Sequence, residues 1–338
     1  MDATIALILL QDGVVNGAIY ALLALSLVLV FAVTRVILIP QGEFVAIGAL
    51  TFAALDAGKT PGSLWLLAGL GAAAFLSGLW QERQGLLWLA LETLAWPAAV
   101  VGLTLALASR KLGVAVEAAL SVAIVTPMAP YLYRVVFQPL AERSVLILLV
   151  ASIGAHLALT GLGLVFFGPE GYRAEGFSDA TFTLGAMTIS GQALWIIGMA
   201  AAVMAGLALF FGHTLAGKAL RATAVNRLGA RLVGIATSLS GRIAFALAGF
   251  IGALSGVLIV PLTTVYYDTG FLTGLKGFVA AIIGGLVSYP LAAAAAIVVG
   301  CVESFASFYA SAFKEVIVFT VIIPVLLWRS LVSPAEEE

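Results

Sequence analysis

The sequence predicts an all-α polytopic membrane protein, and three observations support this prediction. Of the 338 residues, 62% are hydrophobic and only 10% are charged, whereas about a quarter of the residues of a soluble domain are charged. The mean hydropathy is +1.15, and the charges gather between long apolar runs such as 21–33. Because these runs are unbroken, they fit helices and not the alternating strands of a membrane barrel.

About 11 apolar segments are candidates for transmembrane or partly discontinuous helices, because a span needs about 20 apolar residues. In chain order they are 14–34, 42–55, 63–79, 86–107, 114–133, 144–167, 191–211, 243–262, 275–288, 290–308 and 316–328. Two of them, 42–55 and 275–288, are short for a lone helix in lipid. We treat residues 1–338 as one transmembrane domain, whose odd number of spans places the two termini on opposite sides.

Residues 213–242 form a basic loop without any acidic residue. Because cytoplasmic loops carry an excess of lysine and arginine, we expect this loop and the C-terminus on the cytoplasmic side. Apolar and basic positions recur there at helical spacing and predict a short amphipathic helix, with Leu220, Ala224, Arg227, Leu228 and Arg231. Two interpretations are open: a helix attracted to anionic lipid, or one that inserts into a groove on a soluble partner.

The two short segments resemble each other, since Gly42–Leu50 and Lys276–Gly285 are both glycine-interrupted and start near an ionisable residue. Paired short segments of this kind indicate the permeation path of a transporter and possible inverted repeats, although chance similarity of glycine-rich stretches competes. We expect Glu43 and Lys276 either to meet as an ion pair or to lie at a wet interface. Glu303 lies within an apolar span, where we expect it to line the path, to be hydrogen-bonded in the interior or to lie at the outer rim. His156 is expected to make a helix–helix hydrogen bond, with a ligand or proton-relay role as the alternative.

Four stretches of the chain resemble the membrane permease subunits of bacterial branched-chain amino acid ATP-binding-cassette importers. They are residues 16–25 leading into 39–44, residues 133–140, residues 220–235 and residues 276–285. The third stretch, which resembles the ATPase-coupling helix of the family, is the most specific. The resemblance implies a branched-chain amino acid as the solute, and because Gln41 replaces the family's histidine, a related small organic solute is the alternative. Residues 62–113 are an apparent insertion with about two additional spans.

The resemblance, taken with the two short segments, implies two sets of site residues. The translocation path would be formed by Gln41, Gly42, Glu43, Phe44, Lys276, Gly277, Phe278 and Glu303. The ATPase-coupling surface would be formed by Leu220, Arg221, Asn226, Arg227, Ala230, Arg231, Leu232 and Gly234.

The resemblance also implies partners in the bacterial inner membrane and on both sides of it. A paralogous permease would complete the passage, two ATP-binding cassette ATPases would bind below, and a periplasmic binding protein would deliver the solute near the outer loop 168–190. We expect no catalytic residue and no cofactor in this chain, since ATP and Mg²⁺ would be bound by the ATPases. In agreement, the sequence has no G-x-x-x-x-G-K-[ST] phosphate loop.

Two distant histidines and one cysteine predict no metal site, and a net charge of −1 argues against a nucleic-acid partner. A membrane-embedded enzyme should show clustered His, Asp or Ser at one depth, which the sequence does not. The alternative function is an ion-coupled secondary transporter of a small organic acid or amino acid. Such a transporter would not need an acid-free basic helix on one loop.

Overall fold

Long apolar helices dominate the computed structural model, which describes residues 3–81, 85–107, 113–184 and 187–332. Eight helical segments are long and apolar enough to cross a membrane, by length and composition. They coincide with eight of the predicted spans. The other three predicted spans, 42–55, 275–288 and 316–328, are shorter or interrupted helices. The predicted all-α polytopic membrane fold is confirmed.

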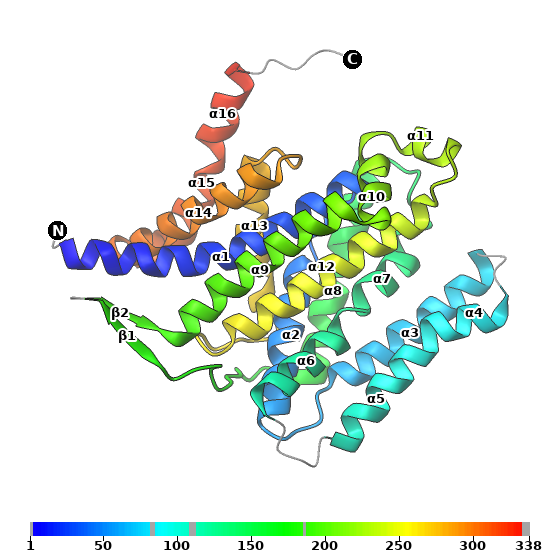
Figure 1. The fold of residues 1–338 in the computed structure, drawn as a ribbon, viewed down its shortest axis with the longest axis horizontal. Coiled ribbons are helices and arrows are strands. Elements are labelled where there is room, and N and C mark those ends of the chain that lie inside the picture. The colour runs from blue at the N-terminus through cyan, green and yellow to red at the C-terminus, as the bar shows by residue number, and fades with distance from the viewer. Residues whose placement is uncertain (1–2, 82–84, 108–112, 185–186, 333–338) are drawn as a thin grey trace.

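The elements follow one another as shown in Figure 1. They are α1 (Ala3–Thr34), α2 (Gln41–Asp56), α3 (Ser63–Gln81), α4 (Leu86–Ala90), the π-helical η1 (Leu91–Ala95), α5 (Trp96–Leu107), α6 (Val114–Val125), α7 (Met128–Leu132), the π-helical η2 (Tyr133–Phe137), α8 (Val145–Phe167), β1 (Thr181–Leu184), β2 (Met187–Ser190), α9 (Gly191–His213), α10 (Leu215–Val225), α11 (Arg227–Leu232), α12 (Thr237–Ile259), α13 (Thr269–Ile283), α14 (Tyr289–Tyr309), the 3₁₀ helix η3 (Ser311–Phe313), α15 (Lys314–Thr320) and α16 (Ile322–Val332).

Three elements differ from the sequence-based expectation. The first helix starts at Ala3, because the apolar residues before position 14 continue the same helix. The basic loop holds two helices and not one, since the side chain of Asn226 accepts a hydrogen bond from Gly229 N at 2.8 Å and starts a new helix there. The outer loop 168–190 contains an antiparallel hairpin, β1–β2, which the sequence did not indicate.

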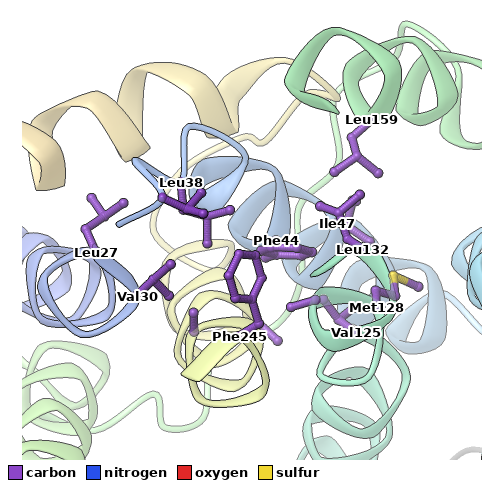
Figure 2. Packing of buried hydrophobic residues seen from close by; sticks show 14 of the residues in the cluster. Leu27, Val30, Leu38, Phe44, Ile47, Val125, Met128, Leu132, Leu159 and Phe245 are labelled. Atoms are coloured by element: carbon purple, nitrogen blue, oxygen red, sulfur yellow. The ribbon is translucent and has the colours of Figure 1, made fainter. Parts of the chain in front are cut away.

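The hydrophobic core is built on close helix–helix contacts. Along α1 and α14, an added Cβ at Gly300 would overlap the backbone of Gly17, so only small residues allow this approach. Figure 2 shows a second region, where Phe44 of α2 and Phe245 of α12 pack together beside side chains of α6, α7 and α8. This core fixes the start of α2, whose first turn carries Gln41, Gly42 and Glu43.

The predicted insertion 62–113 forms a helical hairpin, made of α3 and the α4–η1–α5 helix, at one side of the bundle (Figure 1). It packs on α6 and α7, and both of its arms are candidate spans. Large apolar side chains such as Trp80 and Trp88 are exposed on its outer face. A face of this kind suits a lipid environment.

The bundle has two distinguishable ends. We call the end that carries α10 and α11 the basic end, and the end that carries β1 and β2 the hairpin end (Figure 1). The last helix, α16, projects away from the bundle, and the predicted cytoplasmic C-terminal residues 333–338 lie outside the described residues.

Candidate functional site

The two short helices α2 and α13 meet in the middle of the bundle. Gln41 starts α2, and its Nε2 donates a 3.0 Å hydrogen bond to the carbonyl of Ala248, the middle residue of α12. A Cβ added at Gly42 would overlap the carbonyl of Gly270, and one at Gly274 would lie 2.9 Å from Gly42 Cα. The glycines therefore permit direct contact between the first turns of two discontinuous helices.

A non-helical segment, residues 35–40, leads from α1 into this site. Arg35 has a positive φ of 61°, and the buried side chains of Val36 and Leu38 anchor the segment in the core. The N–H of Ile39 donates to the hydroxyl of Ser152 on α8 at 2.9 Å. Irregular backbone at membrane depth is tolerated where protein covers it and satisfies its polar groups, as it does here.

Glu43 forms its contact with α8 and not with α13. Its Oε1 lies 2.9 Å from Nδ1 of His156, the middle residue of α8. The Phe271 ring of α13 stacks on the His156 imidazole with centroids 4.6 Å apart. The expected helix–helix hydrogen bond of His156 is confirmed, whereas the alternative that Glu43 pairs with Lys276 is wrong. Three elements, α2, α8 and α13, thus bring a carboxylate, an imidazole and an aromatic ring together.

Unsatisfied polar atoms mark the same place. Gln41 is 1% exposed, and its Oε1 has no hydrogen-bond partner among the described residues. No side chain caps the N-terminus of α2 or of α13. Buried polar atoms are normally paired, so the Gln41 Oε1 is a free acceptor that a solute could use.

Lys276 and Glu303, both predicted path residues, meet in a separate cluster. Lys276 Nζ lies 2.5 Å from Glu303 Oε1 and 3.3 Å from Glu315 Oε1. The hydroxyl of Tyr20 donates to Glu303 Oε2 at 2.5 Å. The cluster joins α1, α13, α14 and α15, and Glu303 also lines a cavity of about 580 Å³ that includes Asp12.

The remaining predicted path residues serve packing in this structure. Phe44 is fully buried in the core. Gly277 lies against Leu23 of α1, where an added Cβ would come within 2.6 Å of Leu23 Cβ. Phe278 is partly buried at the edge of the same core.

The predicted coupling residues divide into anchors and exposed positions. Leu220 and Ala230 are buried. Arg227 Nη1 donates to the carbonyl of Ala141 at 2.8 Å, and Arg231 donates to Glu142 Oε1 at 2.8 Å. The Arg231 guanidinium holds the pKa of the exposed Glu142 carboxyl below its ordinary value, so this pair is ionised at neutral pH. These contacts fix α11 to the loop between η2 and α8.

The outer side of α10 and α11 is an exposed apolar surface beside cations. Leu228 is 68% and Leu232 is 81% exposed, and Val225 and Val233 are exposed as well. Of these four residues, only Leu232 stands among the predicted coupling residues; Arg221 is exposed beside them. The positive φ of Gly234, 86°, turns the chain toward α12. These side chains therefore form an apolar surface that is open to contact with another molecule.

A metal centre is not indicated. Within the described ranges, no group of three or more His, Cys, Asp or Glu residues could hold a metal ion.

Comparison with known proteins places these features in a family context. A family model described as "Branched-chain amino acid transport system / permease component" matches residues 9–326. The chain is 26% identical over 281 residues to the high-affinity branched-chain amino acid transport system permease protein BraD of Pseudomonas aeruginosa, over 80% of this chain and 92% of that protein. It is 29% identical over 203 residues to the corresponding permease protein LivH of Escherichia coli (strain K12), over 57% of this chain and 65% of LivH.

Proposed function

The chain belongs to the family of permease components of branched-chain amino acid transport systems, and from this premise we propose that it is the membrane-spanning permease subunit of an ATP-driven importer. The solute is a branched-chain amino acid or a related small organic solute. The observation that carries the proposal is the exposed apolar surface on α10 and α11, which stands beside arginines that α11 uses to hold the bundle. A helix in this position suits insertion into a groove on a soluble ATPase.

The proposal assigns each partner to one part of the chain. Two ATP-binding cassette ATPases bind ATP and Mg²⁺ and dock at the basic end, which then faces the cytoplasm of a bacterial inner membrane. A periplasmic binding protein docks at the hairpin end, near β1 and β2. A paralogous permease covers the face of α8 and α13, where Ile153, Leu157 and Leu272 are exposed around His156.

The site at the start of α2 offers complementary groups for an amino acid. The carboxylate of Glu43 and the unpaired Oε1 of Gln41 accept hydrogen bonds from an ammonium group. The first turns of α2 and α13 meet at this site, and the positive end of each helix dipole favours a carboxylate. Glu43 is 1% exposed, so the passage is closed in this structure and opens when α8 or α13 moves.

Replacing Glu43 by glutamine should lower the rate of solute uptake about tenfold or more, because a hydrogen bond to a charged group contributes about 1.5–3 kcal/mol. The thermal stability should change little, since the amide still hydrogen-bonds His156. Uptake by proteoliposomes that contain the complete transporter measures this effect. Glu170→Gln, an exposed carboxylate in the outer loop, is the matched control. A Glu43→Gln transporter with the rate of the native protein would remove Glu43 from the path.

Co-expression with the neighbouring genes, followed by purification in mild detergent, tests the functional class. We expect two ATPase chains to co-purify with this chain and to drive uptake when ATP is inside the vesicles. A chain that purifies alone and moves solute down an ion gradient would contradict the proposal in favour of a secondary transporter.

A further inference from the structure

A charged cluster lies where the helical hairpin made of α3 and α4–η1–α5 meets the rest of the bundle. The carboxylate of Glu92 contacts the guanidinium of Arg134, with Oε2 and Nη1 3.4 Å apart, and that of Arg242. The Arg134 side chain is 2% exposed. Neither the proposed path nor the proposed docking surface uses these three residues.

Two rare backbone segments bring the cluster together. Glu92 lies in η1 and Arg134 lies in η2, and both segments are π-helical. Such segments are uncommon and often occur at functional sites, because they change the direction in which a side chain points. Here they place opposite charges from two neighbouring helices against each other.

The cluster lies near the basic end of the bundle. Arg242 stands in the second turn of α12, which starts at this end, and Glu92 stands in the second turn after the start of α4. At about 1.5 Å per helical residue, both charges are about 10 Å or less from the helix ends. This depth is within reach of lipid headgroups.

A cavity of about 450 Å³ opens beside the cluster. It lies between η1 and α5 of the helical hairpin, α6–α7 and α12. Its walls are mostly apolar, with Trp96, Pro130 and Ile243 among them, while both arginines and Glu92 line its polar part. Among the described residues that line the cavity, two arginines and one glutamate carry charge, so cations are in excess there. The Nε of Arg242 is buried and has no hydrogen-bond partner among the described residues.

We propose that this cavity binds an anionic phospholipid from the leaflet at the basic end, with the phosphate on Arg242 and Arg134 and an acyl chain along the apolar wall. Guanidinium groups match phosphate oxygens in geometry and charge. Basic pockets between transmembrane helices near the cytoplasmic side are typical sites for such headgroups. Glu92, which is 43% exposed, is the internal counterion that the phosphate displaces. The bound lipid holds the helical hairpin of α3 and α4–η1–α5 to α12, the helix that follows α11.

Native mass spectrometry of the full-length chain with added phosphatidylglycerol or phosphatidylcholine tests the proposal. The native chain should retain phosphatidylglycerol preferentially. Arg242→Gln should weaken that retention about tenfold, equivalent to about 1.4 kcal/mol, whereas Glu92→Gln should strengthen it, because the competing carboxylate is gone. Arg143→Gln, an exposed arginine in the loop before α8, is the control and should retain phosphatidylglycerol as the native chain does.

Glu92→Gln keeps the proposal falsifiable if Arg242→Gln does not fold. In a thermal-shift measurement, phosphatidylglycerol should raise the melting temperature of Glu92→Gln more than that of the native chain. Equal retention of the two lipids by the native chain would overturn the proposal. So would a Glu92→Gln chain that gains nothing from phosphatidylglycerol.

Discussion

Replacing Lys276 by methionine is expected to destabilise the protein by about 3–5 kcal/mol, because removing one partner of a buried ion pair leaves the other charge without compensation. The Lys276 side chain is only 8% exposed and is the cation for Glu303 and Glu315. Tyr20 also donates to Glu303, so one substitution disturbs four helices. We expect a large fall in melting temperature in detergent and a low yield of folded protein.

Lys314→Met is the control for this experiment. Lys314 is 40% exposed and lies 3.9 Å from Glu315, so its loss should cost about 0–1 kcal/mol, as for surface ion pairs in general. The double variant Lys276→Met with Glu303→Gln should recover much of the stability, because it removes both charges of the pair. If Lys276→Met alone melted at the native temperature, the cluster would not be a structural ion pair.

The helices could be predicted because long apolar runs in a charge-poor chain have few other solutions in lipid. The two short segments were also identifiable, since Gly42–Leu50 and Lys276–Gly285 are interrupted by glycine at similar places. The likeness left open whether the two segments meet, and the structure places Gly42 on Gly270 and Gly274, which precede the second segment.

The ion-pair partners could not be predicted from the same likeness. Lys276 comes two residues after Gly274, about 200° around the helix, so it faces away from α2 and toward Glu303 and Tyr20. Glu43 then meets His156, whose position depends on how α8 packs. The meeting of Glu92, Arg134 and Arg242 depends on two π-helical segments, for which the sequence has no clear signal.

In the coupling region, residues 213–242, some features could be predicted from the sequence and others could not. The basic character and the helical spacing were readable, but the break at Asn226 was missed, although asparagine is a preferred residue at a helix N-terminus. The roles of the arginines also differ from a simple charged surface. Arg227 and Arg231 hold α11 in place, which leaves the apolar side chains as the groups available to a partner.

Replacing Leu228 and Leu232 by aspartate should abolish ATP-driven uptake while the chain stays folded. Both side chains are exposed, so the double variant removes nothing from the core, and its melting temperature should stay close to the native one. In a groove on an ATPase, however, two carboxylates would be buried without partners, and each such group is strongly unfavourable. The ATPases should therefore no longer co-purify with the variant.

A control variant with the same two added charges outside α11 distinguishes the loss of docking from a general effect of surface charge. Ala222 is exposed on α10 and Ser238 lies at the start of α12, so Ala222→Asp with Ser238→Asp adds two carboxylates to the same end of the bundle without changing any residue of α11. This control should weaken uptake much less than Leu228→Asp with Leu232→Asp. If the α11 variant still bound the ATPases and transported at the native rate, then α11 would not be the docking element. The membrane-surface interpretation of the basic loop, with its arginines near anionic lipid, would then be the better explanation of its charge.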